Sequence, residues 1–372
     1  MGPTAPATGL PVRPASVDVV VHGRDGSHPG SAFVRVLLRL RWAERAGLVT
    51  ARVHDAASIL RAGPAPDSDA LLVQRDALLD AATAASVLGR AAREGIPVVL
   101  DVDDDLFSPS ARRRLAGGGY SDERFAALDA TVAAAARVVV STEVLVGRLP
   151  AGTHEVHVLP AALDAATWGL AEPSGAALGE GLLYMGSHTH ADDLALLDGL
   201  DVRDRAAVDV VGVTGPDGAR GLRLLDVARR PIPYPDLVAW LRSEAPRWGA
   251  GLAPLVDDGF TAAKSDLKFL EYSAAGLATV ASAVPAYRAA GAHGALLVTG
   301  GRDAWGPAVS RLRLDPDERA GRARTARAHV RAHRTYREDD GWLTALVGPS
   351  DGRQEPPPRP RPSSAVIRRP DA

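Results

Sequence analysis

The sequence of 372 residues contains no cysteine and no asparagine, and only two of its 43 basic residues are lysines. The absence of cysteine excludes disulfide bonds, cysteine-ligated zinc, iron–sulfur clusters and thiol nucleophiles. The 45 acidic residues balance the basic ones, which argues against a strongly basic nucleic-acid-binding protein. The two lysines, Lys264 and Lys268, lie four residues apart in a chain that otherwise uses arginine, so we take their surroundings as the first candidate site.

Long apolar runs are missing as well. No run approaches the roughly 20 apolar residues that span a bilayer, and residues 1–14 lack the apolar centre of a signal peptide. The Pro- and Arg-rich stretch 348–372 has too little apolar content to order itself. We therefore expect a cytoplasmic protein with a disordered N-terminus (1–15), a disordered tail (348–372) and at most peripheral contact with a membrane.

Short β-branched runs alternate with longer segments of helical period, and the length favours two domains. Continuous apolar strands joined through helices are typical of parallel sheets covered on both faces. We expect an α/β fold of two doubly wound, Rossmann-like domains facing a central cleft, with residues 16–165 and 181–324 joined by a linker, 166–180. The expected strands are 17–23, 70–74, 96–101, 137–142, 155–160, 181–187, 207–213, 250–255, 279–283 and 295–299.

One short helix of the second half combines the two lysines with a carboxylate. We expect it to begin near Lys264, with Ser265 or Asp266 capping its free N–H groups. At 100° per residue, Lys264, Lys268 and Glu271 then share one face. Helix N–H groups and ammonium groups suit a diphosphate, and a carboxylate suits sugar hydroxyls. The alternative is a solvated helix face carrying a Lys268–Glu271 ion pair.

A second candidate is the loop after the first strand of the second half. Small residues and hydroxyls would let the backbone approach a phosphate, and a histidine could donate a hydrogen bond to it. A His-x-His metal site completed by Asp192, or simple helix capping with exposed histidines, are the alternatives. The loop consists of Gly186, Ser187, His188, Thr189 and His190.

These patterns resemble the GT-B glycosyltransferases, specifically the GT4-like group of retaining enzymes. Residues 264–282 (KSDLKFLEYSAAGLATVAS) match the family pattern K-S-x-x-K-hydrophobic-x-E, ending at a glycine and a strand. Residues 183–194 (LYMGSHTHADDL) resemble the start of the nucleotide-binding domain. Residues 96–107 (IPVVLDVDDDLF), preceded by 72–75 (LVQR), resemble the acceptor-side domain.

The resemblance implies that Glu271 holds the nucleotide ribose and that Lys264 and Lys268 meet the phosphates. It also implies that helices at about 325–347 return to the N-terminal domain. A nucleotide-sugar donor would be the co-substrate, no cofactor or metal would be obligatory, and the acceptor would be a glycan, a lipid-linked sugar or a natural product. Ala263 stands where the family has the first of two glutamates, so a non-catalytic nucleotide-sugar-binding protein is an alternative.

Aspartates cluster after the strand that ends near residue 101. Carboxylates at one strand end repel one another, so a cation or hydrogen bonds must offset that cost. The resemblance implies that Asp103 and Asp104 act at the acceptor in catalysis, with Asp101 and Arg35 on the acceptor side. As an alternative, Asp101-x-Asp103 resembles the nucleophile motif of haloacid-dehalogenase-type phosphohydrolases. The third interpretation is capping and loop solvation without a functional role.

Overall fold

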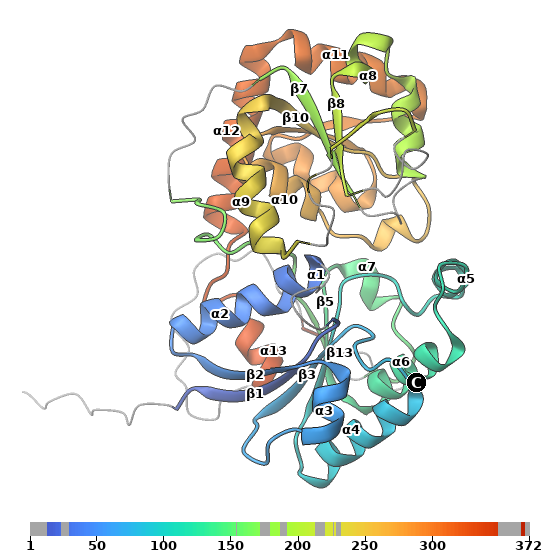
Figure 1. The fold of residues 1–372 in the computed structure, drawn as a ribbon, viewed down its shortest axis with the longest axis vertical. Coiled ribbons are helices and arrows are strands. Elements are labelled where there is room, and N and C mark those ends of the chain that lie inside the picture. The colour runs from blue at the N-terminus through green and yellow to red at the C-terminus, as the bar shows by residue number, and fades with distance from the viewer. Residues whose placement is uncertain are drawn as a thin grey trace, which may run out of the picture.

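Two α/β domains are stacked along the long axis of the molecule (Figure 1). The computed structural model describes residues 13–23, 30–153, 155–171, 179–186, 192–212, 220–225, 227 and 232–348, and the backbone of 366–368. Each domain has one sheet with helices on both of its faces, which confirms the predicted fold class.

The N-terminal domain is built on six parallel strands in the order β6-β5-β4-β3-β1-β2, with β13 antiparallel at the β6 edge. Strand β2 was not predicted, because it is an edge strand in which only the first residue is fully buried and its sequence lacks a continuous apolar run. The strands are β1 (Ala15–Val20), β2 (Val49–His54), β3 (Ala70–Gln74), β4 (Val98–Val102), β5 (Ala135–Val140), β6 (Glu155–Val158) and β13 (Val366–Arg368). Because β13 lies within the predicted disordered tail, that prediction does not hold for these three residues.

Helices cover both faces of this sheet. On one face, α1 (Gly30–Ala32), the π-helical turn η1 (Phe33–Leu37) and α2 (Leu38–Arg45) form one continuous rod. On the other face, α4 and α6 bury their apolar stripes against the strands. The remaining bounds are α3 (Ala56–Ala62), α4 (Ala81–Arg93), α5 (Pro109–Gly117), α6 (Asp122–Ala134) and α7 (Glu143–Val146).

The C-terminal domain has six parallel strands in the order β12-β11-β10-β7-β8-β9. Its strands are β7 (Gly181–Met185), β8 (Val208–Val211), β9 (Arg223–Leu224), β10 (Trp248–Ala253), β11 (Ala278–Ser282) and β12 (Leu296–Val298). Its α-helices are α8 (Val202–Ala206), α9 (Tyr234–Glu244), α10 (Leu267–Ala274), α11 (Trp305–Leu314) and α12 (Pro316–His333). Its other helical turns are η3 (Asp193–Gly199), η4 (Ala245–Arg247), η5 (Thr261–Ala263), η6 (Pro285–His293) and η7 (Arg302–Ala304).

Two segments cross between the domains and lie against each other. Leu163 N–H donates to Arg334 O at 2.8 Å, and Tyr336 N–H donates to Leu163 O at 3.2 Å. Beyond this contact the chain enters α13 (Trp342–Val347), which packs on the N-terminal sheet (Figure 1). The Arg137 guanidinium holds α13 there by donating to the carbonyl oxygens of Ala345 and Leu346.

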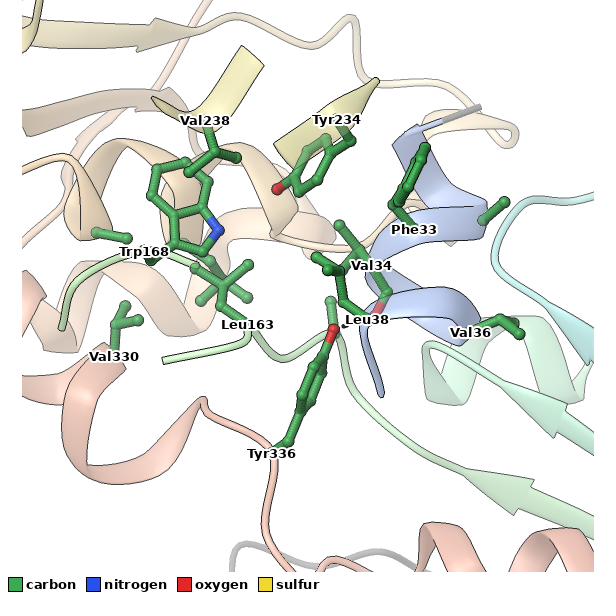
Figure 2. Packing of buried hydrophobic residues seen from close by; sticks show 14 of the residues in the cluster. Phe33, Val34, Val36, Leu38, Leu163, Trp168, Tyr234, Val238, Val330 and Tyr336 are labelled. Atoms are coloured by element: carbon green, nitrogen blue, oxygen red, sulfur yellow. Dashed lines mark hydrogen bonds between the residues drawn. The ribbon is translucent and has the colours of Figure 1, made fainter. Parts of the chain in front are cut away.

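A buried apolar layer joins the two domains (Figure 2). Phe33 and Val34 of the N-terminal rod meet Tyr234 and Val238 of α9, and Trp168 of the predicted linker fills the space beside them. The layer belongs to a single apolar cluster that reaches into both domains. Among the described helices, none has the length and apolar character that crossing a bilayer requires.

Candidate functional site

An ion pair joins the loops at the carboxyl ends of the two sheets. Lys264 Nζ of the C-terminal domain lies 3.0 Å from Asp104 Oδ1 of the N-terminal domain. Beside it, Thr142 Oγ1 donates to Ala263 O at 3.0 Å. The structure therefore brings together two residues that the sequence placed in separate domains, at the position where doubly wound folds bind ligands.

The predicted start of the lysine-bearing helix is wrong. Lys264 has an extended backbone after η5, Ser265 follows it, and α10 begins at Leu267. Asp266 is in the capping position, but its side chain makes no cap hydrogen bond. Both of its carboxylate oxygens accept from Arg334 at 2.7 Å instead, because a guanidinium offers two charge-assisted bonds where a backbone N–H offers one neutral donor.

Lys268 and Glu271 occupy one face of α10 as expected, and each is only partly exposed. Burial and the neighbouring charge of Lys264 lower the pKa of Lys268 to about 8. Burial raises the pKa of Glu271 to about 7, although the Tyr234 hydroxyl and Lys268 oppose that rise. Two neighbouring, partly buried ammonium groups favour the binding of an anion.

Tyr234 is a site residue that the sequence analysis missed. Its hydroxyl donates to Glu271 Oε1 at 2.6 Å, and its ring stacks on Phe33 with the centroids 6.2 Å apart. The available signal was the run Pro233-Tyr234-Pro235 immediately before a helical segment, which fixes the side chain at a helix start.

Arg35 and Asp101 bind each other in the interior. Arg35 Nε and Nη2 donate to the two oxygens of Asp101 at 3.2 and 2.6 Å, and Nη1 donates to Leu159 O at 2.5 Å. The side chains are 8% and 3% exposed. This mutual pairing favours a structural contribution, and their predicted acceptor-side role stays a prediction. In the phosphohydrolase alternative, Asp101 would have to leave Arg35 before it could act as a nucleophile.

Asp103 and Asp104 share one cation, Arg75. Its Nη1 lies 3.3 Å from an oxygen of each carboxylate. Burial is the main cause that raises the pKa of Asp103, and the negative charges of Asp104 and Asp101 raise it further. Arg75 adopts a left-handed backbone (φ 53°), which is uncommon outside glycine and clusters at functional sites. The sequence stretch 72–75 pointed to this strand, but no local pattern identified Arg75 as the counter-ion.

Of the predicted donor loop, only Gly186 is described. A Cβ placed there would come within 2.5 Å of the Tyr184 hydroxyl, so the position requires glycine. Ser187, His188 and His190 lie outside the described residues. Within the described part of the chain, no three histidine, aspartate or glutamate side chains form a group that could hold a metal ion.

Comparison with known proteins finds similarity in structure alone. Neither protein-family models nor curated protein sequences match this chain. HepE of Anabaena, solved with UDP and glucose, superposes with a TM-score of 0.56 at 12% identity, covering 86% of this chain and 96% of its own. An α,α-trehalose-phosphate synthase (UDP-forming) from Burkholderia vietnamiensis gives 0.54 at 15% identity over 91% and 97%. A glycosyltransferase from Rickettsia africae gives 0.52 at 9% identity over 90% and 96%. These likenesses assign the fold to the GT-B architecture.

Asp101→Asn tests the structural role of the buried pair. Removing one charge leaves Arg35 buried without its counter-ion, so we expect the free energy of unfolding to fall by about 3–5 kcal/mol. Urea denaturation followed by circular dichroism measures this. The matched control is Asp129→Asn, which breaks the exposed pair with Arg112 and costs about 1 kcal/mol or less. Equal small losses in both variants would contradict the structural assignment.

Arg75→Ala tests the shared counter-ion. Without the guanidinium, the pKa of Asp103 rises further. A carboxyl group whose pKa is raised in the folded state stabilises the fold at low pH, and this stabilisation is lost as the pH rises through the folded-state pKa. We expect a loss of roughly 3 kcal/mol at pH 7.5 and a smaller loss at pH 4.5. Urea denaturation at both pH values checks this, and a pH-independent loss would refute it.

Proposed function

We propose that this protein is a glycosyltransferase of the GT4-like, retaining type, which transfers a sugar from a nucleoside-diphosphate sugar to an acceptor. The observation that carries the proposal is the pair Lys264 and Lys268 beside Glu271, at the boundary between two Rossmann-like domains. The GT-B fold adds support, since HepE was solved with UDP and with UDP-glucose. UDP is accordingly the first nucleotide to test.

Each residue of this group has a defined task in the proposed reaction. The two lysines bind the diphosphate and stabilise the negative charge that develops on it as the glycosidic bond to the donor sugar breaks. Glu271 accepts hydrogen bonds from the ribose hydroxyls. No metal is required for these steps, because two ammonium groups supply the positive charge at the leaving group.

Asp103 and Asp104 belong to the N-terminal domain and lie on its side of the domain boundary, where they would bind acceptor hydroxyls. Arg75 holds the two carboxylates next to each other, so that they would orient an acceptor before the new glycosidic bond forms. Since Asp104 pairs with Lys264 in this structure, a bound diphosphate competes with Asp104 for that lysine, while Arg75 still holds Asp104.

Lys264→Ala and Lys268→Ala test the assignment of the leaving-group site. Each substitution removes a cation that stabilises the departing diphosphate, and we expect sugar transfer to fall at least 100-fold while the fold is retained. A coupled assay for UDP release measures turnover, and circular dichroism checks the fold. Arg302→Ala, which removes an exposed cation elsewhere in the same domain, is the matched control. Turnover near that of the wild type in both lysine variants would overturn the proposal, and tight UDP binding without turnover on any acceptor would favour the non-catalytic alternative.

UDP binding at pH 8 should be accompanied by proton uptake. With a pKa of about 8, Lys268 is half protonated in the free protein, and a diphosphate beside it raises that pKa. We expect about half a proton to be taken up per UDP bound. Isothermal titration calorimetry in two buffers of different ionisation enthalpy measures the uptake. It should vanish in Lys268→Ala, and proton release by the wild type would contradict the account.

A further inference from the structure

One side chain at the domain boundary contacts three separate parts of the protein. The Tyr234 ring stacks on Phe33 of η1 at an interplanar angle of 21°, and it meets the Trp168 ring at a centroid distance of 6.4 Å. Figure 2 shows Tyr234 between these two side chains. The N-terminal domain, the connecting segment and α9 therefore fix the position of this ring together.

The Tyr234 hydroxyl extends this arrangement to α10. It donates to Glu271 Oε1 at 2.6 Å, a charge-assisted bond when the carboxylate is ionised. Among the described residues, no other group hydrogen-bonds to the Glu271 carboxylate. One oxygen of Glu271 is thus held, and Oε2 retains its full capacity to accept.

We propose that Tyr234 is a positioning residue of the nucleotide site. Its hydroxyl holds Oε1 of Glu271 so that Oε2 accepts from the ribose hydroxyls, and its ring couples this carboxylate to the N-terminal domain through Phe33. The inference rests on the proposed function, because it requires a nucleotide ribose at Glu271. A consequence is that donor affinity depends on the arrangement of the two domains, although Tyr234 itself touches no substrate.

The charges around Glu271 determine how the Tyr234 hydroxyl affects the pKa of this carboxylate. Lys268 precedes Glu271 on α10, Lys264 lies before the helix, and Asp104 and Asp193 act on Lys268 from other elements. The Tyr234 hydrogen bond and the Lys268 charge lower the pKa of Glu271, whereas burial raises it. Loss of the hydroxyl therefore shifts Glu271 toward its protonated form, which accepts hydrogen bonds less well.

Tyr234→Phe tests the inference, because it keeps the ring and its stacking and removes only the hydroxyl. The dissociation constant of UDP is measured by calorimetry from pH 6 to pH 9. Wild-type affinity should rise as Glu271 ionises and fall as Lys268 loses its proton. In Tyr234→Phe, we expect UDP to bind about tenfold more weakly at pH 7, with the rising limb displaced to higher pH and the falling limb unchanged.

Tyr336→Phe is the matched control. Tyr336 also lies at the domain boundary, and its hydroxyl donates to Val34 O at 2.6 Å without contacting Glu271. This variant should keep the wild-type rising limb. In a Glu271→Gln background, Tyr234→Phe should change UDP affinity less than twofold, because the carboxylate that it positions is already gone.

The outcomes separate the two proposals. If the wild type binds none of UDP, GDP, dTDP or ADP, the proposed function fails and this inference fails with it. If the wild type binds UDP and Tyr234→Phe gives the same affinity and rising limb, only the positioning role is overturned. Equal weakening at every pH with a lowered melting temperature would show a purely structural role and would also overturn it.

Discussion

The apolar layer between the domains is the constraint on which the site depends. Phe33 and Val34 on one side and Tyr234 and Val238 on the other belong to a single cluster, so the domains share part of their core. Because the strands that lead to the site are parallel within each sheet, fixing the domains in this way also fixes the carboxyl ends of these strands opposite each other. The Lys264–Asp104 contact at 3.0 Å is a result of that arrangement.

The charges at the domain boundary are the second constraint on the site. Each domain carries partly buried charges that are costly to keep without a counter-charge. In the N-terminal domain, Arg75 offsets Asp103 and Asp104. In the C-terminal domain, Lys264 is paired with Asp104, whereas burial and the charge of Lys264 lower the pKa of Lys268. In the proposed reaction, a diphosphate adds negative charge beside the two lysines and competes with Asp104 for Lys264.

Predictions from the sequence were correct where the structure follows from local patterns, and they were wrong where a contact with a distant residue determines the local structure. Apolar runs located β3 to the residue, while the edge strand β2 escaped because its exposed positions interrupt the apolar pattern. The cap predicted at Asp266 failed because Arg334, 68 residues later, takes both carboxylate oxygens. No local pattern could indicate that pairing.

In the candidate site as well, local spacing predicted some features and long-range contacts determine others. Lys268 and Glu271 share a helix face, and their spacing alone placed them correctly. The partner of Asp101 is Arg35, 66 residues away, and the partner of Glu271 is Tyr234 from another helix. These long-range contacts determine the surroundings of each carboxylate, and no local sequence pattern could have indicated them.

The central claim is that Lys264, Lys268 and Glu271 form one nucleoside-diphosphate site. A crystal structure of the chain with UDP tests it most directly. The account predicts the diphosphate within hydrogen-bond distance of both lysine ammonium groups, the ribose hydroxyls on Glu271, and Lys264 no longer paired with Asp104. UDP bound elsewhere, with the Lys264–Asp104 pair intact, would contradict it.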